Sequence, residues 1–125
     1  MIIVLADTSG LLAALDSAHP EHVWANEAIM AAGLLIVSPL LLSELDHVAT
    51  RELGPEITDD HLGAAQAVRV RYRALDLDLA DAVNVALAAD YDTDAILTLD
   101  RRDFRAVRPL GRHKAFRVLP DDLPL

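Results

Sequence analysis

The sequence contains no cysteine and very few aromatic residues. The absence of cysteine excludes disulfide bonds and thiolate metal sites, and it is typical of proteins from reducing compartments. Aromatic residues make up 4% of the 125 residues and hydrophobic residues 53%, so the core must consist mainly of aliphatic side chains. This length and composition predict a single domain that covers residues 1–125.

Long hydrophobic runs are also absent. No apolar segment reaches the roughly 18 residues that a membrane-spanning helix requires. The apolar stretch at the start of the chain is about five residues long and lacks the basic flank of a signal peptide. We therefore expect a soluble, cytoplasmic protein with no membrane partner.

Basic residues are scarce, with 11 lysines and arginines against 20 acidic residues and a formal net charge of −9. This balance disfavours nucleic-acid binding, because contacts to phosphates require a basic surface. The basic residues are nevertheless grouped, with three between positions 69 and 73 and seven between positions 101 and 117. Such groups either make a local basic strip or pair with acids of the same chain, and the two interpretations are about equally good.

Short apolar segments alternate with segments of helical pattern along the chain. The predicted strands are 2–6, 34–37, 95–99 and 116–119. The predicted helices are 9–16, 20–33, 39–53, 59–73 and 78–89, the first capped by Thr8 or Ser9. The segment 101–107 is predicted to be a short helix or a turn. This alternation implies parallel strands joined by crossover helices. We predict a three-layer α/β/α sandwich with a four- or five-stranded, mainly parallel sheet.

Two of the predicted strands lead directly to an aspartate. Asp7 follows the first strand, and Asp100 follows the apolar segment 95–99 with Asp103 three residues later. Ligands and catalytic groups gather at the carboxyl ends of strands in such sheets. We therefore expect Asp7 and Asp100 at the same sheet edge, although each alone would also suit a helix cap.

Two further acids lie on apolar faces of predicted helices. Glu44 shares its face with the apolar residues three positions before it and four positions after it. Between Leu79 and Ala89 only Asp81 and Asn84 are polar, and their spacing puts them on one face of a buried helix. A carboxylate in such a place is costly unless it is paired or binds a metal. The simpler alternatives are a rim position for Glu44 and an ion pair with an arginine for Asp81.

Four carboxylates that converge at one place require a cation, because like charges a few ångströms apart destabilise the fold. Oxygen ligands favour Mg²⁺ or Mn²⁺ over Zn²⁺, and the histidines show no HxH or HExxH spacing. One or two such metals can activate a water and stabilise the leaving oxygen in phosphodiester hydrolysis. The candidate metal ligands are Asp7, Glu44, Asp81 and Asp100. The candidates for orienting them are Thr8, Ser9, Asn84 and Thr98, with helix capping as the favoured alternative for the hydroxyls.

The ordered set of motifs resembles the PIN-domain ribonucleases, in particular the VapC toxins of bacterial toxin–antitoxin pairs. The matching segments are Leu5-Ala-Asp-Thr-Ser-Gly10, Ser43-Glu44, the stretch 79–88 and the stretch 97–104, which together extend over nearly the whole chain. The resemblance implies that the family's acidic quartet corresponds to Asp7, Glu44, Asp81 and Asp100. It adds Asp103 as a fifth acid whose involvement in metal binding varies.

The resemblance also implies an activity and partners. The activity would be Mg²⁺- or Mn²⁺-dependent endonucleolytic cleavage of RNA, with tRNA or rRNA as the usual target. A small VapB antitoxin would cover the active-site groove, and the toxin would commonly be a homodimer. We expect Arg101, Arg102 and Arg105 to contact the RNA.

Three other functions compete with this prediction. Aspartyl-phosphate phosphatases need a second aspartate two residues after the first, where this chain has Ser9, and receiver domains need a lysine late on a strand, whereas the only lysine is Lys114. A non-catalytic binding module would be expected to have lost one of the four acids. A PIN-domain nuclease that processes RNA without an antitoxin stays open.

Overall fold

A computed structural model of the chain describes residues 1–44 and 57–124, and side chains of residues 42–44 fall outside that description. The part of the predicted third helix beyond Glu44 therefore lies outside the described residues. None of the described helices is long and apolar enough to cross a membrane.

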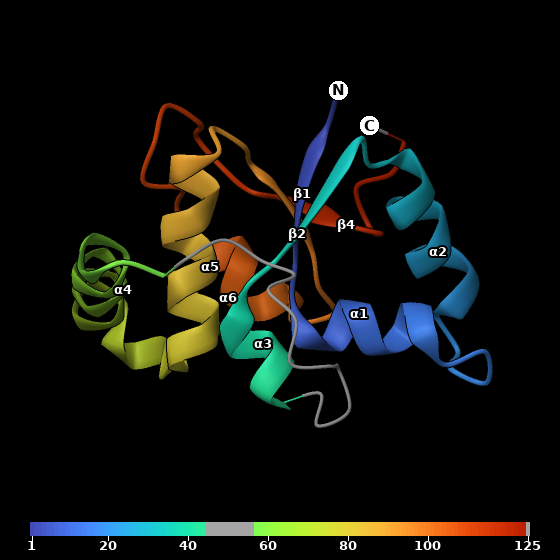
Figure 1. Cartoon of the computed structure of the whole chain (residues 1–125), viewed down its shortest axis with the longest axis horizontal. Helices are drawn as coiled ribbons and strands as arrows, with labels where there is room; N and C mark the ends of the chain where they lie inside the picture. The colour runs from blue at the N-terminus through green and yellow to red at the C-terminus, as the bar shows by residue number, and fades with distance from the viewer. Residues whose placement is uncertain (45–56, 125) are drawn as a thin grey trace.

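Four short strands form one parallel sheet at the centre of the molecule (Figure 1). They are β1 (Ile3–Ala6), β2 (Leu34–Val37), β3 (Ala95–Leu97) and β4 (Arg117–Leu119), in the spatial order β2-β1-β3-β4. The prediction of a parallel sheet is confirmed. β3 ends two residues before the predicted boundary, at Leu97, although the backbone N–H of Thr98 still donates to the carbonyl of Leu119 at the end of β4.

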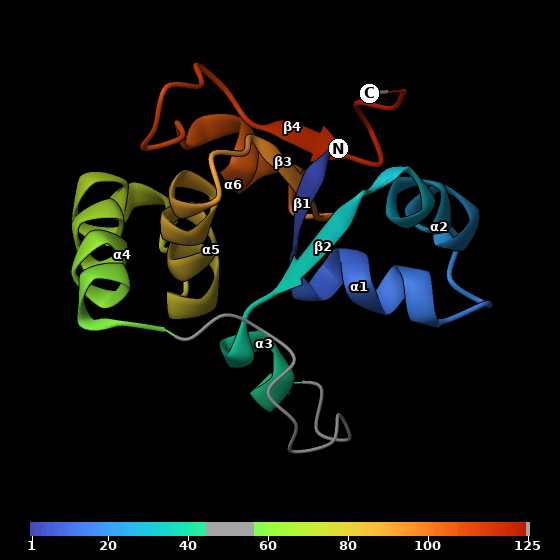
Figure 2. The same ribbon diagram turned by 45° about the horizontal axis from the view of Figure 1, so that its top comes forward.

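Helices cover both faces of the sheet, which confirms the three-layer arrangement. The helical elements are α1 (Thr8–Leu15), α2 (His22–Ala31), α3 (Pro39–Glu44), α4 (Asp59–Arg71), the 3₁₀ turn η1 (Arg73–Leu75), α5 (Leu79–Asp90) and α6 (Arg101–Ala106). Helices α1 and α2 lie on one side of the sheet, and α4, α5 and α6 lie on the other (Figures 1 and 2).

The predicted cap of the first helix is wrong by one residue. Thr8 is already helical, and Asp7 occupies the N-cap position with extended backbone angles (φ −98°, ψ 156°). The chain turns into α1 immediately after β1, so the helix begins before the hydroxyls predicted to cap it. The prediction for α4 is correct, because the Thr58 side chain accepts a hydrogen bond from the backbone N–H of His61.

Alternate residues of each strand face two separate apolar clusters, as the period of two in a strand requires. Leu5 and Ile96 pack toward α4, α5 and α6, whereas Val4 and Leu97 pack toward α1 and α2. The middle of α5 is buried all round, as its nearly uniform apolar sequence predicted. This burial holds the polar residues of α5 against the carboxyl edge of the sheet.

Candidate active site

Asp7 is held at the end of β1 by two hydroxyl groups. Its side chain is 5% exposed. Oδ2 accepts hydrogen bonds from Oγ1 of Thr98 at 2.6 Å and from Oγ of Ser9 at 3.1 Å. β1 and β3 are adjacent with Ala6 opposite Leu97. The residues that follow these two, Asp7 and Thr98, therefore also lie next to each other. The sheet register thus explains why Thr98 reaches Asp7.

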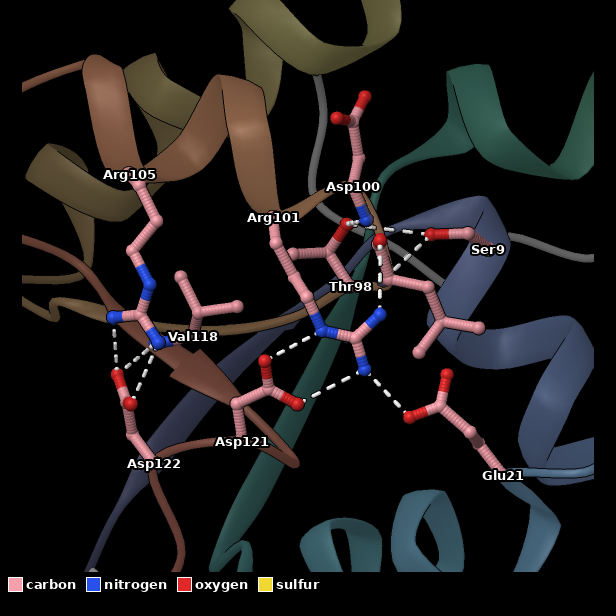
Figure 3. Close-up of polar contacts among 10 residues, drawn as sticks. Ser9, Glu21, Thr98, Asp100, Arg101, Arg105, Val118, Asp121 and Asp122 are labelled. Atoms are coloured by element: carbon pink, nitrogen blue, oxygen red, sulfur yellow. Dashed lines mark hydrogen bonds and ion pairs between the residues drawn. The ribbon is translucent and has the colours of Figure 1, made fainter.

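The same two hydroxyls also connect to the turn that carries Asp100. Thr98 Oγ1 accepts a hydrogen bond from the backbone N–H of Asp100 at 2.9 Å, and Ser9 Oγ accepts one from the backbone N–H of Leu99 at 2.8 Å (Figure 3). The hydroxyl oxygens lie 3.3 Å apart. Asp7 and the start of α6 are therefore positioned by one small network.

Asp81 projects from the first turn of α5 and is 8% exposed. Its pKa is raised from 3.8 to about 9, first by burial and then by the charge of Asp7 and a hydrogen bond with Asp7. The charges of Asp78 and Asp100 raise this pKa further. Asp81 is thus a buried acid whose surroundings hold too little positive charge to ionise it at neutral pH.

Asp100 and Asp103 complete the group of acids at this edge of the sheet. One carboxylate oxygen from each of Asp81, Asp100 and Asp103 lies within 4.8 Å of the others. The pKa of Asp100 is raised, first by burial and then by a hydrogen bond with Asp103 and by the charge of Asp103. We call Asp7, Asp81, Asp100 and Asp103 the acidic cluster.

Helix capping and ion pairing, the simpler explanations for these acids, do not agree with the contacts of their side chains. Asp7 and Asp100 occupy N-cap positions of α1 and α6, yet neither side chain makes a capping hydrogen bond. Within the part of the chain that the structure describes, no arginine, lysine or histidine forms an ion pair with Asp81. Within the described residues, Asp7, Asp81 and Asp100 therefore have no cationic partner, whereas Asp103 contacts Arg102.

Glu44 is the last residue of α3, and its side chain lies outside the described residues. Helix α3 begins directly after the carboxyl end of β2, and in Figure 1 it lies at the same end of the sheet as the starts of α1 and α5. The predicted role of Glu44 as a ligand stays a prediction.

Asn84 follows Asp81 by three residues on α5 and is fully buried. Its amide nitrogen donates to the carbonyl of Ala6 at 3.1 Å, which ties α5 to the last residue of β1. Its Oδ1 is buried with no hydrogen-bond partner among the described residues. Thr8, the other predicted orienting residue, is half-buried at the first position of α1.

Two of the three arginines predicted to contact RNA form ion pairs with acids of the same chain (Figure 3). Arg101 bonds to Glu21 at 2.5 Å and to both carboxylate oxygens of Asp121 at 2.5 and 2.9 Å. Arg105 bonds to both oxygens of Asp122 at 2.7 Å. In Figure 3 the Asp100 carboxylate points away from the Arg101 guanidinium.

The third arginine, Arg102, is more accessible. Its side chain is 76% exposed and donates to Asp103 at 3.2 Å. It therefore lies beside the acidic cluster and offers only a weak, solvent-exposed contact to it.

Two residues that shape this site were not among the predicted site residues. Asp78 caps α5 by accepting the backbone N–H of Asp81 at 2.7 Å, and the Asp-x-x-Asp spacing is the signal that predicts such a cap. Gly10 lets α1 pack directly on β3, since a Cβ there would lie 2.6 Å from the carbonyl oxygen of Leu97. The motif at residues 5–10 contained this glycine, but only the folded structure shows that it packs against Leu97.

The acidic cluster suits a divalent cation. Its potential ligand atoms are carboxylate oxygens, and within the described residues no histidine joins them. Burial first and then mutual repulsion raise the pKa values of Asp81 and Asp100, and a cation there would offset the repulsion. The residues present therefore fit the metal that the sequence predicted.

Comparison with known proteins gives two informative matches, although no model of a protein family matches the chain. The chain is 38% identical over 136 residues to Ribonuclease VapC26 of Mycobacterium tuberculosis (strain ATCC 25618 / H37Rv), covering 94% of this chain and 100% of that protein. It is also similar to the crystal structure of Mycobacterium tuberculosis VapC20, a sarcin-ricin loop cleaving toxin. That match has a TM-score of 0.64 and 17% identity, and covers 78% of this chain and 89% of the other. The match to VapC20 shows a likeness of fold, whereas the match to VapC26 extends over nearly the whole sequence.

Proposed function

The chain belongs to the VapC family of PIN-domain ribonucleases, and from this membership we propose that it cleaves RNA at the acidic cluster as the toxin of a toxin–antitoxin pair. The observation that carries the proposal is the burial of like charges at one sheet edge, with oxygens of Asp81, Asp100 and Asp103 within 4.8 Å of one another. Such an arrangement costs stability unless a cation offsets it, and perturbed carboxylates of this kind are typical of catalytic sites.

In this proposal the metal is Mg²⁺ or Mn²⁺ and the ligands are Asp7, Glu44, Asp81 and Asp100, with Asp103 as a further ligand. The support is the all-oxygen donor set of the described acids and the raised pKa values of Asp81 and Asp100. A bound cation of this kind activates water and offsets the charge that develops on the phosphate.

The protein's own residues prepare the site for that chemistry. Thr98 and Ser9 fix the Asp7 carboxylate, so that the acid does not have to be ordered when the metal binds. Asn84 fixes the last carbonyl of β1, and the Asp78 cap fixes the first turn of α5. Because these contacts are made within the chain, the acids keep their positions before RNA arrives.

The test is cleavage of total RNA by the wild type with Mg²⁺ or Mn²⁺, against the wild type in EDTA and against Asp7→Asn. We expect cleavage only by the wild type with metal. Asp60→Asn is the matched control, because it makes the same chemical change at an exposed position on α4. Equal cleavage in all samples would disprove the mechanism, and sequencing of the RNA ends would identify the tRNA or rRNA cut.

We further propose a small VapB-like antitoxin and a second copy of the chain as protein partners. The support is apolar surface on the first two helices: Leu15 is 69% exposed, Trp24 57% and Met30 84%. Copurification with the product of an adjacent small reading frame and light scattering of the isolated protein test the two partners separately. A monomer that binds no such product would contradict both.

A further inference from the structure

Five of the ten basic side chains between Arg69 and Arg117 form ion pairs with acids of the same chain. Arg101 and Arg105 pair with the tail, while Arg112 pairs with Asp92 at 2.9 Å and Arg117 with Asp94. Among the described residues the other five form no such pair, and they are Arg69, Arg71, Arg73, Arg108 and Lys114. Three of these five line one cleft. Within residues 1–41 and 57–124, no carboxylate forms an ion pair with Arg71, Arg108 or Lys114, and all three are exposed.

The fold brings these three cations together from two distant segments. Arg71 ends α4, while Arg108 and Lys114 belong to the segment after α6, which passes the end of α4 (Figure 2). Together with Tyr72 and Arg112 they line a cleft of about 250 Å³. None of the described residues that line it is acidic. We call it the basic cleft.

The walls of the basic cleft are held in place by Tyr72. Its hydroxyl accepts a hydrogen bond from the backbone N–H of Arg108 at 3.2 Å, which joins the segment after α6 to the end of α4. Its ring packs on the apolar core, and the Arg71 guanidinium lies 5.5 Å from the ring centroid. A cation ordered in this way loses less conformational entropy when it binds a ligand.

Helix α6 connects the basic cleft to the acidic cluster. Asp103 lies in the first turn of α6, and Arg108 is the second residue after its end. Five residues of chain, part helical and part extended, separate them by on the order of 10 Å. The exposed Arg102 donates both to Asp103 at 3.2 Å and to the carbonyl of Leu75, three residues after Tyr72, at 3.5 Å.

We propose that the basic cleft binds backbone phosphates of the RNA substrate, a few nucleotides away from the bond that is cut; this rests on the proposed ribonuclease function. A protein with a net charge of −9 and an acidic active site repels RNA, so binding requires uncompensated cations close to the site. The guanidinium groups of Arg71 and Arg108 match phosphate geometry, and Lys114 adds a third charge. In this proposal the cations of the basic cleft bind the RNA, whereas Arg101 and Arg105 are paired within the chain.

The experiment measures binding of a labelled single-stranded oligoribonucleotide of mixed sequence by fluorescence anisotropy, in EDTA and over a series of salt concentrations. The protein carries Asp7→Asn so that the RNA stays intact. We expect Arg71→Gln and Arg108→Gln each to weaken binding roughly five- to tenfold and to reduce the salt slope by about 0.7 for each phosphate that is no longer neutralised. Lys114→Gln is expected to act in the same direction.

Arg73→Gln is the matched control, because it removes the same charge from an exposed arginine two residues from Arg71 and outside the basic cleft. It is expected to leave the affinity nearly unchanged. Equal losses of affinity in Arg73→Gln and Arg71→Gln would overturn the proposal, since the effect would then come from net charge. Equal melting temperatures verify that each variant is folded.

Two further outcomes separate this proposal from its alternatives. If the cleft variants lose binding to a polyglutamate peptide but not to the oligoribonucleotide, the cleft serves an acidic protein segment and the RNA proposal is overturned. The double variant Arg71→Gln/Arg108→Gln is also tested for RNA cleavage. If the wild type cleaves RNA in an Asp7-dependent way and the double variant cleaves it with an unchanged KM, the ribonuclease function stands and the cleft proposal fails. If the wild type cuts no RNA but the cleft variants lose RNA binding, the cleft stands and the ribonuclease function fails.

Discussion

At the scale of single residues, Asp81 is the acid whose surroundings most oppose its charge among the residues that the structure describes. Its pKa of about 9 in the folded protein lies above the 3.8 of the free side chain, because of burial first and of Asp7 second. Between these two values the folded state keeps a proton that the unfolded state has released. The free energy of unfolding therefore decreases as the pH rises through this range.

Replacement of Asp81 by asparagine removes this pH dependence. In EDTA we expect the wild type to lose on the order of 1–3 kcal/mol of stability relative to Asp81→Asn between about pH 5 and about pH 8. Urea unfolding at several pH values measures the difference. Addition of Mn²⁺ is expected to restore the loss in the wild type only, and parallel pH curves for the two proteins would contradict the assignment.

A second prediction at this scale concerns Thr98, whose hydroxyl bonds to Asp7 and to the backbone of Asp100. Thr98→Val is expected to lower RNA cleavage by about 10- to 100-fold, because the carboxylate loses its orientation. Thr93→Val is the matched control: its buried hydroxyl also makes two hydrogen bonds, to Ile3 and Ala95, at the other end of β3. Both variants should lose similar stability in urea. An equal loss of cleavage in both would assign Thr98 a purely structural role.

At the scale of elements, the approach of α1 to β3 decides where Asp7 lies. Gly10→Ala places a Cβ at 2.6 Å from the Leu97 carbonyl oxygen, so α1 must move away from the sheet. We expect a loss of roughly 1–3 kcal/mol in the free energy of unfolding, together with weaker cleavage. Gly63→Ala in the middle of α4 meets no atom within 4 Å and is expected to stabilise the protein by about 0.5–1 kcal/mol. Urea unfolding of both variants compares the two sites, and a stabilised Gly10→Ala would refute the close packing.

At the scale of the whole molecule, Arg101 joins three parts of the chain that lie far apart in the sequence. It follows Asp100 directly, and its guanidinium contacts Glu21 before α2 and Asp121 in the carboxyl-terminal tail (Figure 3). The hydrogen bonds with these acids raise the pKa of Arg101 above its ordinary value. The arginine thus serves to fix the tail against the start of α6.

This pairing can be separated from a direct contact of Arg101 with RNA. Asp121→Asn breaks one ion pair of Arg101, whereas Arg101→Gln also breaks the pair with Glu21. We expect a loss of about 1 kcal/mol for Asp121→Asn and a somewhat larger loss for Arg101→Gln, because both pairs are of intermediate exposure. If Arg101 also contacts RNA, as the sequence predicted, Arg101→Gln alone weakens binding in the anisotropy assay. If the two variants bind RNA equally well, Arg101 acts only within the chain.

Much of the fold followed from local sequence. The strand 34–37 was predicted at its observed boundaries, and Thr58 and Asp78 begin helices at the expected places, because apolar runs and capping residues act over a few neighbouring positions. The convergence of Asp7, Asp81 and Asp100 was also predictable, since an acid that ends a strand or interrupts a buried helix is unusual in itself. The helix boundary at Thr8 was missed, because it depends on how sharply the chain leaves β1.

The sequence by itself therefore determined most of the elements, the layers and the convergence of Asp7, Asp81 and Asp100, because burial and periodicity depend on neighbouring residues. Only the tertiary structure decided which charges are compensated. Arg101 and Arg108 have the same chemistry and lie seven positions apart, yet one is paired with Glu21 and Asp121 and the other faces an open cleft beside Arg71. The partners come from segments up to 80 positions away, and an electrostatic interaction depends on distance in space and not on distance along the chain.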